Sequence, residues 1–210
     1  MEQEAVRTLN RDIVTCTLCR LSLTRINAVP GEGPVPSGLL FIGEAPGRNE
    51  DLTGRPFVGR AGAVLEELLS SIGLERSRVF ITSIIKCRPP ENRIPRKDEI
   101  AACAGYLDRQ IDLLSPEIIV PMGRLASEQV FSHFGIPHGS IGSIHGKIFH
   151  SITPCGQIVI IPVYHPAAVT HNPLLRGAVF QDFRNIGTLL EGGERSGRNN
   201  PGLDRRLIQE

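Results

Sequence analysis

An apolar run that ends abruptly in a loop of glycine and proline most constrains the fold of this chain. Residues 39–42 are Leu-Leu-Phe-Ile, and the sequence Gly-Glu-Ala-Pro-Gly begins directly afterwards at Gly43. A short apolar run bounded in this way is typical of a buried strand that opens into a loop. In open α/β sheets, ligands bind at the carboxyl ends of strands. We therefore expect Glu44 at the mouth of a cleft, although a tight connection with one solvated carboxylate would give the same pattern.

The residues around this loop exclude two common nucleotide-binding motifs. No Gly-Lys-Ser/Thr follows, as a phosphate-binding P-loop requires, and the dinucleotide fingerprint Gly-x-Gly-x-x-Gly is absent here. Further along, Phe57 lies among glycines and arginines in residues 54–62, with no periodic apolar pattern around it. An aromatic side chain in such a loop either covers the core or presents a ring face on which a base can stack.

The rest of the chain alternates β-prone runs with segments of helical periodicity. This alternation predicts an α/β fold with a mostly parallel sheet and right-handed crossovers. Two loops that contain glycine or proline, after the first and the last strand, would then meet at one edge of the sheet. The predicted strands are residues 39–42, 79–85 and 118–122 and a hairpin over 147–161, and the predicted helices include 4–14, 61–72, 98–114 and 174–190.

Length and composition predict one domain over residues 1–190 and a flexible tail over 191–210, which is rich in glycine, serine and asparagine. The net charge is only +1, so any binding to nucleic acid must depend on local basic patches. No stretch approaches the ~20 apolar residues that span a bilayer. The acidic N-terminus lacks the pattern of a signal peptide, and we expect a cytoplasmic protein.

Four of the five cysteines have spacings that suit a metal centre. Cys16 and Cys19 form a C-x-x-C pair, and Cys87 and Cys103 follow far along the chain. Four thiolates can hold zinc or an iron–sulfur cluster. Only the first pair has the form of a zinc knuckle, and a cubane is wider than one zinc ion, so the spread of the second pair favours a cluster over zinc. Four unmetallated buried cysteines are the alternative, and Cys155 is expected to be a structural thiol.

With these segments in hand, the chain resembles the type 4 uracil-DNA glycosylases, which carry an iron–sulfur cluster, over most of residues 10–190. The resemblance depends on the loop from Gly43, the loop over residues 54–59, Lys-Cys-Arg-Pro-Pro from Lys86, His-Pro-Ala-Ala-Val from His165 and the four spaced cysteines. It implies a three-layer α/β/α sandwich around a central, mostly parallel, four-stranded sheet. It also implies hydrolysis of the N-glycosidic bond of uracil in DNA after base flipping, which leaves an abasic site.

The resemblance implies a role for each matched residue. The catalytic residues would be Glu44, Asn92 and His165, with His165 donating to the uracil oxygen on which negative charge grows. The substrate-binding residues would be Gly43, Ala45, Phe57 and Ser83, and the DNA-binding residues would be Arg48, Arg88, Arg93, Ala168 and Val169. The ligands of a [4Fe–4S] cluster would be Cys16, Cys19, Cys87 and Cys103.

The implied partner is DNA that contains uracil or other deaminated bases, bound by a monomer at the nucleoid of a prokaryotic cell. Residues 203–210 lack the pattern of a sliding-clamp peptide, so we expect no clamp partner. Basic residues near the cleft, among them Lys86 and Arg60, are expected to contact phosphates. A solvated run of charges would give the same sequence.

Two positions depart from what the resemblance leads us to expect. Ser83 stands where this family usually has asparagine, and a hydroxyl is shorter than an amide and must use water to span the same gap. We therefore expect weaker selectivity for uracil, or tolerance of other deaminated bases such as hypoxanthine. Ala45 stands where other branches of the superfamily have an aspartate that activates water. A catalytically silent nucleic-acid-binding or redox module on the same fold is the alternative function.

Overall fold

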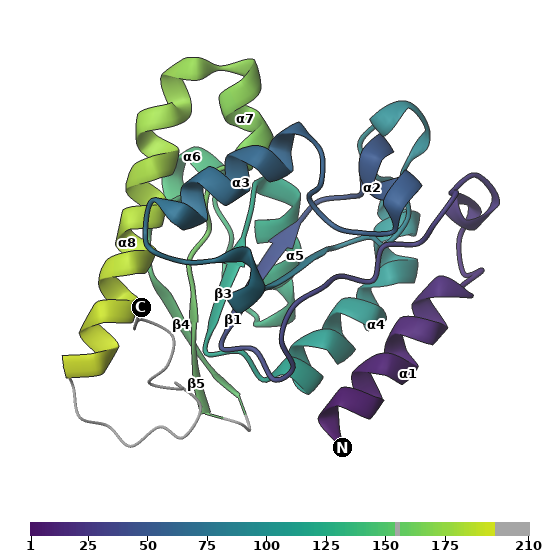
Figure 1. The fold of residues 1–210 in the computed structure, drawn as a ribbon, viewed down its shortest axis with the longest axis horizontal. Helices are drawn as coiled ribbons and strands as arrows, with labels where there is room; N and C mark the ends of the chain where they lie inside the picture. The colour runs from purple at the N-terminus through teal and green to yellow at the C-terminus, as the bar shows by residue number, and fades with distance from the viewer. Residues whose placement is uncertain (154–155, 196–210) are drawn as a thin grey trace.

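A five-stranded sheet forms the middle layer of the computed structural model, which describes residues 1–153 and 156–195 (Figure 1). The strand order is β2-β1-β3-β5-β4, in which all neighbours are parallel except β4, which pairs antiparallel with β5. The strands are β1 (Leu39–Gly43), β2 (Phe80–Ser83), β3 (Ile118–Pro121), β4 (Phe149–Thr153) and β5 (Gly156–Ile160). The prediction of four strands is one short, because both arms of the predicted hairpin join the sheet.

The central strand β1 is apolar throughout because both of its faces are buried. Leu40 and Ile42 belong to one hydrophobic cluster, whereas Leu39 and Phe41 belong to the other. Successive side chains on a strand point to opposite faces, so a strand covered by helices on both sides shows a continuous apolar run in place of an alternating one.

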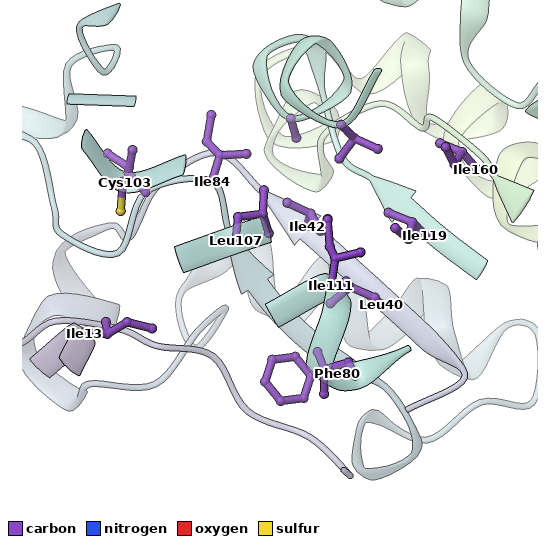
Figure 2. Close-up of a cluster of buried hydrophobic side chains, with 14 of the residues drawn as sticks. Ile13, Leu40, Ile42, Phe80, Ile84, Cys103, Leu107, Ile111, Ile119 and Ile160 are labelled. Atoms are coloured by element: carbon purple, nitrogen blue, oxygen red, sulfur yellow. The ribbon is translucent and has the colours of Figure 1, made fainter. Parts of the chain in front are cut away.

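Helices cover the sheet on both faces and complete the three layers. One face carries α1 (Glu2–Val14), α4 (Lys97–Leu114) and α5 (Arg124–His133), whose apolar side chains pack into the cluster of Figure 2. The other face carries α3 (Arg60–Ser70), α7 (Pro166–His171) and α8 (Arg176–Arg195). The shorter helical segments are α2 (Arg48–Thr53), α6 (Ile141–Ile144), η1 (Arg20–Leu23), η2 (Arg76–Arg78), η3 (Pro90–Asn92) and η4 (Pro173–Leu175).

The last helix extends beyond the predicted end of the domain. Helix α8 continues to Arg195, so residues 191–195 are helical and do not belong to a flexible tail. The predictions for Cys155 and for residues 203–210 lie outside the described residues. None of the helices in the described part of the chain is long and apolar enough to span a membrane.

The topology brings the predicted site to one edge of the sheet. The chain runs from β1 to β2 on one side and continues to β3 on the other side of β1, so the strand order reverses at β1. Ligands in such sheets bind in the crevice outside the carboxyl ends of the strands, at this point of reversal. Gly43 and Ser83 are register partners at the ends of β1 and β2, and His165 follows shortly after β5.

Candidate active site

A cavity of about 670 Å³ opens at this edge of the sheet. Its wall is made by the loop after β1, the segment that leads into α3, the end of β2, the loop that follows β2 and the start of α7. Six of the residues that line it were predicted to be catalytic or substrate-binding: Glu44, Ala45, Phe57, Ser83, Asn92 and His165. Residues separated by up to 121 positions in the sequence therefore face one space.

Phe57 and His165 lie side by side in this cavity. Their ring centroids are 5.7 Å apart, with an angle of 30° between the planes. Phe57 is 7% exposed and has a φ of +50°. Glycines give it room: a Cβ on Gly43 would lie 2.6 Å from the Phe57 ring, and one on Gly62 would lie 1.9 Å from its carbonyl oxygen. Gly43 itself does not line the cavity, and it contributes by letting the ring approach the strand end.

His165 is held as a neutral imidazole with a defined tautomer. The backbone N–H of Ala167 donates to His165 Nδ1 at 3.1 Å, so the ring proton is on Nε2. Burial lowers the pKa of His165 from 6.5 to about 4, because the charged form loses its hydration. At neutral pH, His165 can therefore donate one hydrogen bond from Nε2 without carrying a charge.

Glu50 joins the two loops on which the cavity is built. Its Oε1 accepts hydrogen bonds from the backbone N–H groups of Val58 and Gly59 at 2.8 and 2.9 Å, and its Oε2 accepts one from Gly47 at 3.1 Å. The sequence motifs did not suggest a role for Glu50. Its position three residues after Gly47 could have indicated one, because a glutamate at this position often caps the start of a helix.

Glu44 is a half-buried carboxylate beside a cation that the sequence did not suggest. Burial raises the pKa of Glu44, and the positive charge of Arg124 opposes this rise. Arg124 begins α5, and its Nη1 also donates to Glu128 Oε1 at 3.0 Å. Its position after the third predicted strand was the available signal. The Glu44 carboxylate accepts no hydrogen bond from the described residues, whereas both carboxylate oxygens of Glu50 accept them.

Ser83 presents its hydroxyl to the cavity, and the lysine near it does not face DNA. Ser83 is 4% exposed, and its Oγ makes no hydrogen bond with any residue that the structure describes.

The prediction that Lys86 contacts phosphates is wrong, because this side chain is 1% exposed. Its Nζ donates to Thr82 Oγ1, to the Ser83 carbonyl oxygen and to Gln110 Oε1 at 2.7, 2.7 and 2.6 Å. Burial lowers the pKa of Lys86 to about 8.

The loop after β2 carries two arginines with different partners. Arg88 Nε donates to Asn92 Oδ1 at 2.7 Å, which leaves the amide N–H groups of Asn92 available to a ligand. The Arg93 guanidinium donates to both oxygens of Glu99 at 2.8 and 2.6 Å. This pairing holds the pKa of the Glu99 carboxyl at about 2. Arg93 therefore fastens the loop to α4, and its charge is already compensated.

The remaining predicted DNA-binding residues differ in accessibility. Arg48 is exposed at the start of α2, and Ala168 is half-buried in α7. Val169 is 7% exposed and packs in the hydrophobic cluster on the α3, α7 and α8 face. The prediction that Val169 contacts DNA is therefore wrong. Arg60 also lies at this rim, is exposed and lines the cavity.

The four predicted cysteine ligands line one pocket behind the loop after β2. Cys87 and Cys103 are buried, Cys16 and Cys19 are half-buried, and none of the four forms a disulfide. Cys103 also belongs to the hydrophobic cluster of Figure 2. Burial raises the pKa of Cys103 to about 11, and Arg25 Nη1 donates to Cys87 Sγ at 3.0 Å.

The four cysteines are spread more widely than the ligands of one metal ion. In the described part of the chain, no three cysteine, histidine, aspartate or glutamate side chains converge closely enough to hold a single ion. All four nevertheless face the same pocket, together with the cations Arg25 and Lys86. This donor set fits a metal centre that is larger than a single zinc ion.

Comparison with known proteins agrees with this geometry. Residues 30–185 match the uracil DNA glycosylase superfamily. The type-4 uracil-DNA glycosylase of Sulfurisphaera tokodaii is 46% identical over 184 residues, which cover 87% of this chain and 84% of the relative. The type-4 enzyme of Archaeoglobus fulgidus is 43% identical, with 89% and 94% covered. This chain belongs to the type-4 uracil-DNA glycosylases.

More distant relatives place the chain within the superfamily. The type-4 uracil-DNA glycosylase of Thermotoga maritima is 37% identical and covers 90% of this chain and 96% of the relative. A type-5 uracil-DNA glycosylase of Thermus thermophilus is 36% identical over 153 residues, 65% of this chain and 68% of the relative. The family predicted from the loops and cysteines is thereby confirmed, and so is the sandwich fold.

Proposed function

We propose that this type-4 uracil-DNA glycosylase excises uracil from DNA by holding the flipped base against the Phe57 ring and within hydrogen-bond reach of His165. The observation that carries the proposal is the 5.7 Å between these two rings inside one cavity. A base buried in a stacked duplex must be extruded into a pocket, which costs a few kcal/mol. A cavity of about 670 Å³ at the sheet edge has room for such a base.

Phe57 offers the ring face on which uracil stacks. Stacking of a base on an aromatic side chain contributes ~1–3 kcal/mol, which offsets part of the energy of extrusion. The ring is fixed in advance, since it packs against the core and against Gly43. Binding the base therefore requires little ordering of this side chain.

His165 stabilises the leaving uracil. When the bond between the sugar carbon and the base nitrogen breaks, the electron pair leaves with uracil, and negative charge grows on its carbonyl oxygens. The Nε2–H of neutral His165 donates to one of these oxygens, and a preorganised donor of this kind can be worth ~3–4 kcal/mol. Ala167 holds the tautomer that makes this donation possible.

Glu44 and Asn92 orient the attacking water or the base. Water adds to the sugar carbon and loses a proton. Glu44 is the cavity carboxylate whose oxygens are free for this task, since Glu50 uses both of its own. Asn92 cannot take a proton, and Ala45 offers no carboxylate, so catalysis depends on stabilising the leaving group more than on activating water.

The four cysteines are proposed to hold a [4Fe–4S] cluster. Their spread around one pocket supports this group over zinc, and the two neighbouring cations would balance the negative charge of the thiolates. When bound, the cluster supplies a cross-link between segments that are distant in the sequence. Cys87 lies directly before the loop that brings Asn92 to the cavity, so the link also braces the site.

The proposed partner is DNA, bound by a monomer at the bacterial or archaeal nucleoid. Arg48, Arg60 and Arg88 are exposed or half-buried cations near the cavity without a carboxylate partner among the described residues. Contacts to phosphate release counterions, so affinity is expected to fall steeply with salt.

The test is the formation of abasic sites in oligonucleotides that contain one uracil. We expect wild type to form abasic sites and His165→Ala to excise uracil about 100- to 1,000-fold more slowly. Phe57→Leu should excise it about tenfold more slowly, since leucine keeps apolar volume without a stacking face. A folded wild-type protein that binds this DNA and leaves every uracil in place would refute the proposal and favour a silent binding module.

A further inference from the structure

A buried carboxylate lies beside the residue that precedes His165. Asp182 lies on α8 and is 2% exposed. Burial raises the pKa of Asp182, and the nearby backbone N–H of Tyr164 opposes this rise. The two carboxylate oxygens of Asp182 lie 2.9 and 3.0 Å from His145 Nδ1. Asp182, His145 and Tyr164 all lie outside the set of residues that line the cavity, so excision as proposed above assigns them no task.

The side chain of Tyr164 is fixed by the same group. The rings of Tyr164 and His145 pack with their centroids 4.3 Å apart and their planes at 36°. Gly146 follows with a φ of +69°, and a Cβ there would lie 2.5 Å from Asp182 Oδ1. The Gly146 N–H donates to the carbonyl oxygen of Pro162 at 2.8 Å. The turn that carries His145 therefore fits closely between α8 and the strand end.

Asp182 stands where the sheet ends. The N–H of Val163 still donates to the carbonyl oxygen of Pro121 at 3.0 Å, as a ladder bond would. The next N–H, that of Tyr164, donates to no backbone carbonyl among the described residues, and Asp182 is the carboxylate near it. His165 comes directly afterwards and begins α7 as its N-cap. Asp182 therefore lies beside the last backbone position before the residue that bears the imidazole.

We propose that Asp182 is a positioning residue for excision, which with His145 fixes the backbone at Tyr164 and so sets where the His165 imidazole stands. This inference rests on the proposed role of His165. Displacement of a reacting group by ~1 Å can lower a rate about 100-fold, so a modest loosening of Tyr164 is expected to slow the chemical step. DNA binding is not expected to change, because Asp182 lies outside the cavity.

The test is single-turnover excision by Asp182→Asn on a uracil-containing oligonucleotide. We expect the maximal rate to fall about tenfold, while the DNA concentration that gives half of that rate stays within twofold of wild type. A carboxylate that only stabilises the fold would lower the melting temperature and leave the maximal rate unchanged. The ¹⁵N resonances of the His165 ring give a second readout, since a displaced imidazole shifts them.

The matched control is Asp108→Asn. Asp108 pairs with His133 at 2.8 Å on the opposite face of the sheet, so this variant breaks a more exposed Asp–His pair far from His165. We expect its maximal rate to equal that of wild type. If Asp182→Asn does not fold, His145→Gln replaces it, because His145 is only half-buried, and a threefold fall in maximal rate is expected.

Two outcomes separate the inference from the proposed function. If wild type excises uracil and the folded Asp182 variant matches its maximal rate, the positioning role is wrong and the function stands. If wild type itself leaves uracil in place, the proposed function has failed. Equal losses in the Asp182 and Asp108 variants would also overturn the positioning role, since the effect would then be general.

Discussion

At the scale of single residues, the protonation state of His165 makes a prediction about pH. Because burial lowers its pKa to about 4, the neutral donor persists well below neutral pH. We therefore expect the single-turnover rate to show no loss from His165 between about pH 8 and about pH 5. A rate that falls with an apparent pKa near the ordinary value of 6.5 would contradict the neutral assignment.

The same lowered pKa predicts how stability changes with pH. Between about pH 6.5 and about pH 4 the unfolded chain binds a proton at His165 that the folded chain does not. The free energy of unfolding should therefore decrease as pH falls through this window. Urea unfolding of wild type and His165→Asn at several pH values measures this free energy, and the variant should show a shallower decrease. Equal decreases in the two proteins would argue against a neutral His165 in the folded state.

Ser83 gives a prediction about the choice of base. Its hydroxyl can rotate and can both donate and accept, so it discriminates little between base edges. We expect Ser83→Asn to narrow the substrate range. The measurement is the ratio of excision rates for uracil and hypoxanthine in matched duplexes, which should increase about tenfold or more in the variant. An unchanged ratio with full uracil activity would show that Ser83 does not set selectivity.

Residue identities alone could not tell cations with partners inside the protein from cations that are free to bind phosphate. Lys86 and Arg93 belong to a basic, proline-rich loop, and the sequence suggested phosphate contacts for both. In the fold, the amine of Lys86 finds three oxygen acceptors beneath the surface, and Arg93 finds Glu99. Both partners come from tertiary packing, which the order of residues does not reveal.

At the scale of elements, the start of α3 and the loop before it carry two arginines that should differ in DNA binding. Arg60, the first residue of α3, lines the cavity and has no carboxylate partner among the described residues. Arg55, in the loop between α2 and α3, donates to Glu32 at 2.8 and 3.0 Å. An arginine that is already paired gains less from a phosphate, so the two should differ in DNA binding.

We expect Arg60→Ala to weaken DNA binding and to reduce the slope of log affinity against log salt by about 1. Arg55→Ala should leave the slope close to that of wild type. Fluorescence anisotropy with a labelled abasic-site oligonucleotide over a range of salt concentrations measures both. The same change of slope in the two variants would show that pairing with Glu32 does not keep Arg55 from binding phosphate.

Elements were predicted best where one local signal fixes them. The apolar run before Gly43 gave β1 and its loop, because burial on both faces leaves no polar position in the strand. The fifth strand was missed in the count because a hairpin can pack anywhere, and only the pairing of β5 with β3 brings it into the sheet. The end of α8 lies beyond the prediction because glycines near position 192 suggested a stop, whereas the helix continues to Arg195.

At the scale of the whole molecule, the four cysteines come from three separate parts of the chain. Cys16 and Cys19 follow α1, Cys87 follows β2, and Cys103 lies within α4. The spacing predicted a shared site, and the structure places all four around one pocket. Holding such distant segments together restricts the unfolded chain, and metal binding adds to the free energy of folding.

The last prediction concerns loss of this centre. We expect Cys103→Ala to lose iron, sulfide and the brown colour of an oxygen-protected preparation, and to melt ~10 °C lower. Excision should fall with it, because Cys87 would no longer brace the loop that carries Asn92. Cys155→Ser removes a thiol outside the set of four and should keep the colour. A colourless wild type that contains zinc would overturn the cluster. A Cys103 variant with full iron would show that these four residues are not its ligands, and the link between the cysteine pocket and the active site would then have to be abandoned.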